Sequence, residues 1–128
     1  MTRYEPPRRS WFRKFADAFR GLAQGVLGQS SFLVHIPCAI AVVACGAWLR
    51  VSVSEWCLLV LCITLVLSAE LFNSALEHLA KAIDPQENEH LAIALNIASS
   101  AVLVAALGAV AIGAMVFVPR VMTLVLGQ

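Results

Sequence analysis

Two carboxylates and one amide share a face of an otherwise apolar part of this 128-residue chain. Glu70, Asn73 and Glu77 follow residues 56–67, a run without a charged residue. At about 100° per residue, the spacing i, i+3, i+7 places three side chains within roughly 60° of arc on a helix. One carboxylate of such a set can accept a proton from a hydroxyl group, and the other can bind a divalent metal ion.

The depth of each carboxylate in the apolar segment predicts its chemical role. Glu70 lies nearer the apolar run. Burial makes a carboxylate a stronger base, so we interpret Glu70 as the proton acceptor. Glu77 lies nearer the aqueous edge. Mg²⁺ suits that place, because it retains water and needs few protein carboxylates when a nucleotide supplies phosphate oxygens. The pairing indicates phosphoryl transfer, which needs positioning and charge neutralisation above all.

A purely structural interpretation of the same residues is also open. Glu77 and Lys81 are four residues apart and could neutralise each other near the membrane surface. Asn73 could hydrogen-bond a neighbouring helix. Glu70 fits this interpretation less well, because Lys81, the only cation on the same predicted helix, is three turns away. Ionisable groups in a membrane helix normally face a bundle interior or a wet cavity, which makes the stripe a candidate site.

The composition indicates a small membrane domain. Hydrophobic residues make up 60% of the chain and charged residues 13%, whereas a soluble domain carries about 25% charged residues. So short a soluble chain could not bury that much apolar surface. The four cysteines lie in apolar runs without metal-ligand or redox spacing, so we interpret them as packing residues and expect no disulfide framework.

The positions of these apolar runs predict an all-α integral membrane protein with three transmembrane helices and an N-terminal amphipathic surface helix. The surface helix is expected at residues 7–28, where basic and aromatic residues alternate at helical spacing. The spans are expected at 32–49, 55–82 and 91–118. Ser54 is the expected cap of the second span, and Pro119 is expected to end the third.

The distribution of charge predicts the orientation. Six of the nine Lys and Arg residues precede residue 21, so the N-terminus is expected on the cytoplasmic side. The polar end of the second span then faces the cytoplasm, where ATP is found. The third span is rich in small residues that allow close helix packing, and enclosure of Glu70 and Asn73 by such packing predicts a homo-oligomer.

Residues 70–77, Glu-Leu-Phe-Asn-Ser-Ala-Leu-Glu, resemble the signature Glu-x-x-Asn-(Ser/Thr)-Ala-(Ile/Leu)-Glu of the prokaryotic diacylglycerol kinase and undecaprenol kinase family. The likeness spans nearly the whole chain and includes Phe32 and His35 in the first span. It implies a homotrimer in the bacterial inner membrane that transfers the γ-phosphate of Mg-ATP to a lipid alcohol, diacylglycerol or undecaprenol. The implied roles are general base for Glu70, site organisation for Asn73 and Mg²⁺ binding for Glu77.

Other positions depart from the family pattern. The resemblance places Gln29 at a second metal-binding carboxylate, Leu33 at an arginine, Lys81 at an aspartate, and Leu95 and Asn96 at a nucleotide-binding Lys-Asp pair.

These departures leave two interpretations open. Lys81 and Asn96 could contact the nucleotide while Gln29 binds metal through its carbonyl oxygen, or the chain could be a catalytically inactive relative. A non-enzymatic membrane scaffold is a third class, whereas three spans without a duplicated half argue against a transporter.

Overall fold

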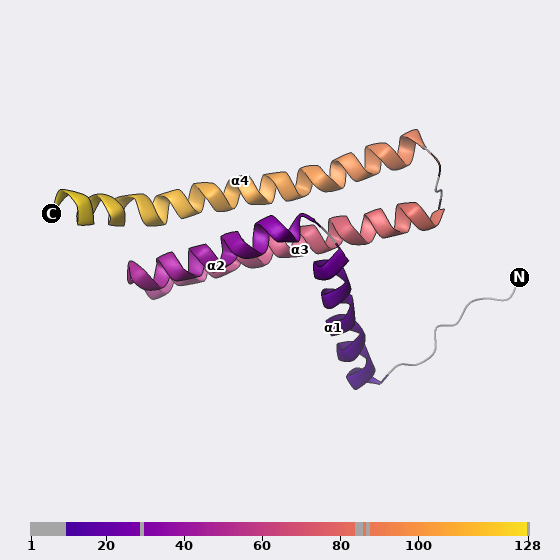
Figure 1. The fold of residues 1–128 in the computed structure, drawn as a ribbon, viewed down its shortest axis with the longest axis horizontal. Coiled ribbons are helices and arrows are strands. Elements are labelled where there is room, and N and C mark those ends of the chain that lie inside the picture. Colours follow the sequence, from indigo (N-terminus) through magenta and orange to yellow (C-terminus); the bar gives the residue numbers. More distant parts are fainter. Residues whose placement is uncertain (1–9, 29, 84–85, 87, 128) are drawn as a thin grey trace, which may run out of the picture.

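The computed structural model describes residues 10–28, 30–83, 86 and 88–127. Four helices account for the regular structure in this part of the chain: α1 (Trp11–Gly28), α2 (Phe32–Trp48), α3 (Val53–Ile83) and α4 (Glu89–Leu126). Helices α2, α3 and α4 run side by side, and α1 projects from them at 105° to α2 (Figure 1). The all-helical architecture predicted from the sequence is confirmed.

Two of the described helices, α3 with 31 residues and α4 with 38, are long and apolar enough to cross a membrane. Helix α2 has 17 residues, which extend about 26 Å at 1.5 Å per residue, slightly less than the thickness of about 30 Å of a hydrocarbon core. It reaches the length of a span only when it is taken together with α1, across the 105° bend.

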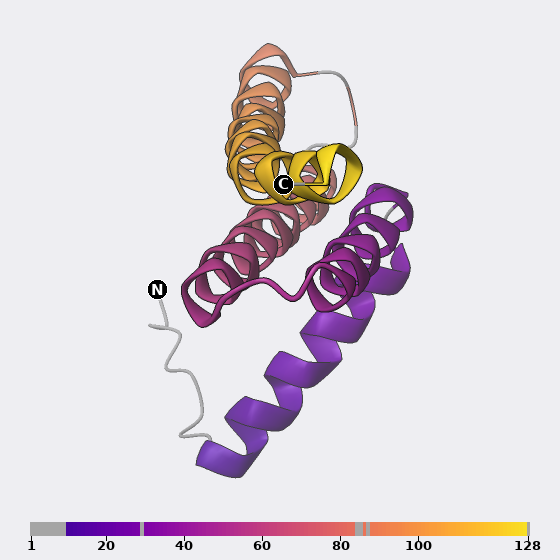
Figure 2. The ribbon, with the colours of Figure 1, turned by 90° about the vertical axis from the view of Figure 1, so that its left-hand side faces the viewer.

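Helix α1 exposes its aromatic face. Trp11, Phe12, Phe15 and Phe19 are each more than 60% exposed, and the helix crosses the direction of the other three (Figure 2). Ser10 precedes the first turn and accepts a hydrogen bond from the backbone of Arg13, so the helix begins at Trp11. Residues 7–9 of the predicted surface helix lie outside the described residues. An exposed aromatic face next to basic residues is typical of a helix in the membrane interface.

Helix α3 begins earlier than predicted, and its cap is Ser52, so the expectation of Ser54 is wrong. The Ser52 hydroxyl accepts from the Glu55 backbone at 3.3 Å, while Glu55 Oε2 accepts from the Ser52 backbone at 2.6 Å. This reciprocal pair is a capping box, which the spacing Ser-x-x-Glu encodes. Arg50 in the turn before it has a φ of 50°.

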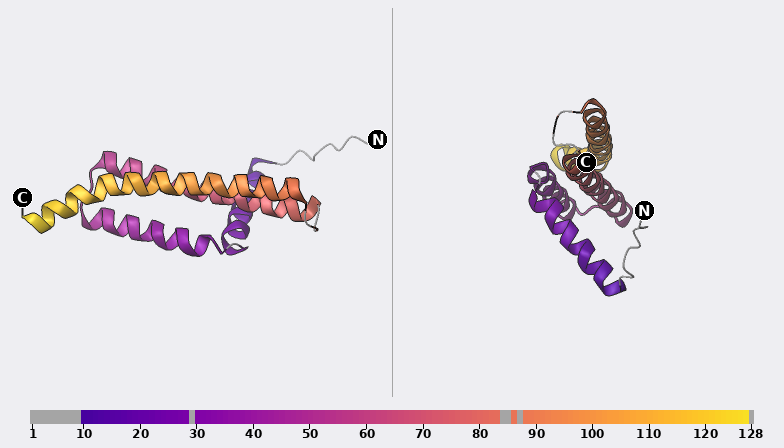
Figure 3. Two further views of the ribbon diagram at one scale, coloured as in Figure 1. Left: turned by 90° about the horizontal axis from the view of Figure 1, so that it is seen from above. Right: turned by 90° about the vertical axis from the view of Figure 1, so that its right-hand side faces the viewer.

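Helix α4 continues past Pro119 to Leu126, so the prediction that Pro119 ends it is wrong. A proline removes one backbone hydrogen bond and bends a helix, and α4 changes direction near its C-terminal end (Figure 3). The carbonyl that loses its backbone partner is that of Met115, four residues before the proline, and the helix continues past this one missing bond. The Thr123 hydroxyl donates to the Pro119 carbonyl at 2.8 Å, and Gly127 ends the helix in the left-handed conformation with a φ of 65°.

An ion pair closes the end of the bundle where α2 turns into α3. Arg120 on α4 donates from Nε to Glu55 Oε1 at 3.2 Å, and its Nη2 pairs with the second oxygen of the same carboxylate. Its Nη1 donates to the carbonyls of Leu49 and Arg50, each at 3.2 Å. A small apolar core of Val51, Leu59 and Val116 is buried in the same cluster of contacts. Arg120 therefore ties α4 to the α2–α3 turn.

We expect Arg120→Ala to lower the thermal unfolding temperature in mild detergent by a few degrees. The substitution removes a bidentate charge pair and two bonds to turn carbonyls, and such pairs are stronger than neutral hydrogen bonds. Arg50→Ala is the matched control, because the Arg50 side chain is exposed in the same turn. Equal unfolding temperatures for the two variants would contradict this role of Arg120.

Candidate active site

Glu70 is buried in the second half of α3, with 3% of its surface exposed. The Ser31 hydroxyl donates to Oε2 at 2.9 Å, and His35 Nε2 lies 2.8 Å from Oε1. Both partners come from the start of α2, where residues four apart lie on one face of a helix. Each carboxylate oxygen has two lone pairs, so Glu70 can still accept another hydrogen bond at each oxygen.

Asn73 connects the second carboxylate, that of Glu77, to α4. Its Nδ2 donates to Glu77 Oε1 at 3.0 Å, and its Oδ1 accepts from the Ser99 hydroxyl of α4 at 3.4 Å. Asn73 is buried, whereas Glu77 is half-buried. The amide therefore connects α3 to α4 and orients Glu77 from the protein side, and Glu77 keeps a more accessible position than Glu70.

These side chains line one cavity of about 370 Å³ between α2, α3 and α4. Its polar wall contains Ser30, Ser31, His35, Glu70, Asn73, Glu77 and Ser99, and its apolar wall contains Val102, Leu103 and Ala106 of α4. The three residues predicted to act together, Glu70, Asn73 and Glu77, are thus brought together. A volume of this order lies within the range of small-molecule sites.

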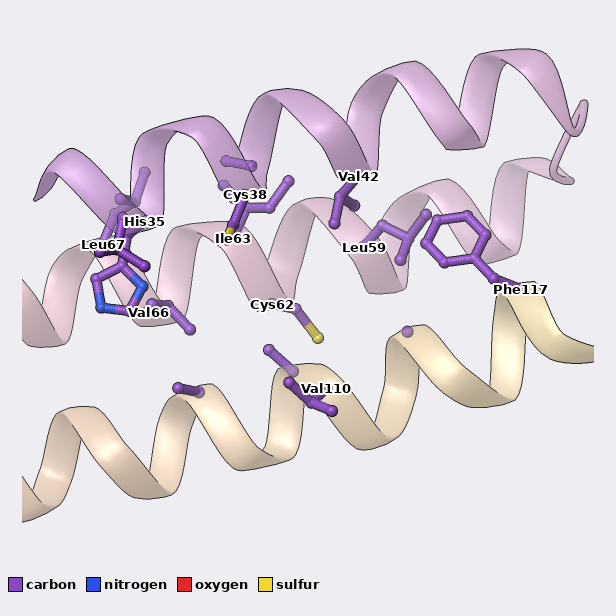
Figure 4. A pocket seen from close by; sticks show the side chains of 15 residues that line it. His35, Cys38, Val42, Leu59, Cys62, Ile63, Val66, Leu67, Val110 and Phe117 are labelled. Atoms are coloured by element: carbon purple, nitrogen blue, oxygen red, sulfur yellow. The ribbon is translucent and has the colours of Figure 1, made fainter.

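A second hollow of about 330 Å³ meets the first at His35 and Ala106. It is lined almost entirely by apolar side chains, including Val42, Leu59 and Val66. Figure 4 shows these side chains between the three helices that lie side by side, with His35 near one end of the groove and Phe117 at the other. The polar cavity therefore continues into an apolar groove that runs along the helices.

The remaining predicted site residues are not gathered at the cavity. Lys81 is exposed, and Asn96 is exposed on α4, where its carbonyl accepts from Ser100; neither lines the cavity. Leu33 is 78% exposed, and Leu95 is half-buried. Gln29 lies outside the described residues. Within the described chain, the cavity wall thus contains the carboxylates of Glu70 and Glu77 and no lysine or arginine.

Three polar partners in the site were not identified from the sequence: Ser31 and His35 for Glu70, and Ser99 for Asn73, although a hydrogen bond from Asn73 to a neighbouring helix was one of the open interpretations. The spacing of Ser31 and His35 places both on one face at the polar end of an apolar span, but it does not identify Glu70 as their partner. Ser99 gave no comparable signal, because small polar residues in a membrane helix commonly serve packing.

A metal ion would find one suitable carboxylate here. The described residues contain no group of three His, Cys, Asp or Glu side chains able to hold a metal by themselves. Mg²⁺, however, is commonly bound by one or two carboxylates together with water and substrate phosphates. Glu77, half-buried and oriented by Asn73, fits that requirement, whereas both oxygens of Glu70 are already in close contact with Ser31 and His35.

Comparison with known proteins identifies the family of the chain. Residues 16–117 match the family model described as "Prokaryotic diacylglycerol kinase". The chain is 32% identical over 110 residues to the undecaprenol kinase of Bacillus subtilis, an alignment that covers 86% of this chain and 89% of that protein. It is also 32% identical over 111 residues to the diacylglycerol kinase of Synechocystis sp., covering 86% of this chain and 63% of that protein.

We expect a cysteine at position 77 to react readily with a water-soluble maleimide and one at position 70 to react slowly. The reagent needs a thiolate in contact with water, and burial suppresses both. The variants Glu77→Cys and Glu70→Cys are made in a background without the four native cysteines. Leu61→Cys is the control, because Leu61 is 62% exposed but lies on the apolar part of α3. Equal labelling at positions 70 and 77 would contradict the gradient of accessibility.

Proposed function

The chain belongs to the prokaryotic diacylglycerol kinase family, and on this basis we propose that it transfers the terminal phosphate of Mg-ATP to the hydroxyl group of a membrane lipid. The observation that carries the proposal is the buried carboxylate of Glu70, which accepts a hydrogen bond from Ser31 and lies 2.8 Å from His35 Nε2, in the same cavity as Asn73 and Glu77. A membrane lipid kinase is also what both named relatives are.

Glu70 is the general base of the proposed reaction. Its carboxylate accepts the proton of the lipid hydroxyl as that oxygen forms a bond to the γ-phosphorus of ATP. The bond between the γ-phosphorus and the bridging oxygen breaks, and ADP leaves with the electron pair. The products are a phosphorylated lipid, ADP and a proton on Glu70, which water removes. Proton transfer by a positioned carboxylate contributes about 10²- to 10⁴-fold in rate.

Glu77 and Asn73 serve the nucleotide side of the cavity. Glu77 is the proposed Mg²⁺ ligand, and the hydrogen bond from Asn73 keeps one of its oxygens in place. When bound, Mg²⁺ would neutralise charge that develops on the phosphate oxygens. The half-buried position of Glu77 suits this part, because an ion at the rim of the cavity can keep its water ligands.

The apolar groove is the proposed place of the lipid chain. A lipid alcohol has a polar head and a hydrocarbon body, and the hollow near Glu70 changes from polar to apolar at His35 and Ala106. A chain in the groove would present its hydroxyl end to the carboxylate. The groove has apolar walls without a distinctive polar group, so both diacylglycerol and undecaprenol remain candidate acceptors.

The proposed setting is the inner membrane of a bacterium, with three spans and a cytoplasmic N-terminus. Support comes from the basic N-terminal helix with its exposed aromatic face and from the apolar helices α3 and α4. A homotrimer is part of the proposal. The cavity wall described above has no lysine or arginine, although phosphoryl transfer requires charge neutralisation, so a neighbouring copy that supplies a basic residue would complete the site.

An inactive relative of the same fold is the second candidate. It is favoured by the position of Lys81 and Asn96 outside the cavity wall, and by apolar residues at positions 33 and 95, where the family pattern has polar ones. The intact pair of Glu70 and Glu77 favours the active kinase.

We expect Glu70→Gln to abolish phosphate transfer in mixed micelles, because an amide cannot take the hydroxyl proton. Glu77→Gln should lower the rate while raising the Mg²⁺ concentration needed for half-maximal activity, since it removes the proposed metal charge. Both are measured as labelled lipid formed from ATP and a lipid alcohol. An active Glu70→Gln variant would exclude Glu70 as base, and an unchanged Mg²⁺ requirement in Glu77→Gln would exclude Glu77 as metal ligand.

Lys81→Ala distinguishes two possible roles of Lys81, phosphate binding and an exposed charge pair. If Lys81 binds phosphate from the nucleotide, its loss should weaken ATP binding by about 10-fold or more, since hydrogen bonds to charged groups are strong. If it forms only an exposed pair with Glu77, the effect on ATP affinity should stay within about twofold. The position of Lys81 outside the cavity wall leads us to expect the smaller effect. ATP affinity is measured by equilibrium binding to protein in detergent, with Arg50→Ala as the charge-matched control.

A further inference from the structure

We infer that Ser31 and His35 are positioning residues that fix the carboxylate of Glu70 for proton transfer, an inference that rests on the proposed function. Neither Ser31 nor His35 belongs to the family signature at residues 70–77. They precede it by 39 and 35 residues; His35 belongs to α2, and Ser31 is the residue directly before that helix. Together with Glu70 they form what we call the carboxylate clamp.

The clamp holds both oxygens of one carboxylate. Ser31 Oγ donates to Oε2 at 2.9 Å, and His35 Nε2 lies 2.8 Å from Oε1. A carboxylate only accepts hydrogen bonds, so the Nε2 of His35 must carry the hydrogen when Glu70 is ionised. The hydrogen bond on one oxygen and the close contact on the other restrict rotation of the carboxylate plane, which a single contact would permit.

Burial shields these contacts from water. Glu70 is 3% exposed and the His35 side chain 21% exposed, so water has little access to compete for the carboxylate. Within the described wall of the cavity, the titratable groups are His35 on α2 and Glu70 and Glu77 on α3; α4 contributes Ser99, Val102, Leu103 and Ala106. Glu77 is engaged by Asn73, which leaves Ser31 and His35 as the donors that the structure shows on Glu70.

The location of His35 explains why a histidine suits this place. Its ring lies near the end of the apolar groove where the polar cavity begins (Figure 4). One nitrogen meets the carboxylate, while the carbon edge of the ring can contact hydrocarbon. A substrate hydroxyl that approaches along the groove therefore passes His35 before it reaches Glu70, and the clamp keeps an unused lone pair of each oxygen in a constant orientation.

The test compares His35→Leu, which removes the donor, with His35→Gln, whose amide nitrogen can occupy the place of Nε2. His35→Leu should lower kcat about 10-fold to 100-fold, the loss expected for one hydrogen bond to a charged group, and leave the KM for ATP unchanged. His35→Gln should recover most of the rate. Ser31→Ala and Ser31→Thr form a parallel pair, and His90→Leu is the control, because His90 is exposed and lies outside the cavity wall.

A second readout does not depend on turnover. The infrared band of the Glu70 side chain, obtained as the difference from Glu70→Gln, should shift in His35→Leu, return towards its original position in His35→Gln, and stay unchanged in His90→Leu.

Several results would overturn the inference. They are an unshifted band in His35→Leu, a His35→Gln variant as slow as His35→Leu, a raised KM for ATP with unchanged kcat, or a rate loss matched by loss of folded protein. If the unmodified protein transfers no phosphate, the proposed function fails, and the infrared band alone decides whether the clamp exists.

Discussion

A carboxylate inside an apolar membrane helix must be hydrogen-bonded, and much of this structure follows from that requirement at Glu70. Placing an acidic side chain at the centre of a membrane helix costs about 2.5–3.5 kcal/mol on insertion scales. A hydrogen bond to a charged group contributes about 1.5–3 kcal/mol, so the bond from Ser31, with His35 Nε2 2.8 Å from the other oxygen, is of the size needed to offset the cost. The start of α2 must therefore lie against the second half of α3, and the bend between α1 and α2 occurs beside the site.

Helix α4 stabilises this arrangement at both ends of the bundle. At the cavity, α4 supplies Ser99 for Asn73 and an apolar wall for the space in front of Glu70. At the opposite end, Arg120 ties the same helix to the α2–α3 turn. The rest of the apolar surface is largely exposed, as expected of helices that face lipid or further copies of the chain. The site is thus held by a few polar contacts between helices whose buried apolar core is small.

The sequence was sufficient for the helices and for the central three residues of the site. Periodicity placed Glu70, Asn73 and Glu77 on one stripe, and the structure brings them to one cavity. The sequence did not identify the contacts between helices. Ser31 and Ser99 contact partners that are distant in the chain, and no local pattern specifies such pairing. Two helix boundaries were predicted wrongly. The cap of α3 was assigned to Ser54, although the spacing Ser-x-x-Glu from Ser52 encodes a capping box. Pro119 was expected to end α4, although a helix can bend and continue past one missing backbone hydrogen bond.

Lys81 and Asn96 show a related limit, because one of the two interpretations drawn from the resemblance had them contact the nucleotide, whereas the structure leaves both outside the cavity wall. The central claim is that the clamped carboxylate still supports chemistry despite these departures. The most direct measurement is the formation of labelled lipid phosphate by the purified, unmodified protein supplied with Mg-ATP and, separately, diacylglycerol and undecaprenol. The account predicts transfer to at least one of these lipids, whereas no transfer to either, together with no ATP binding, would contradict it.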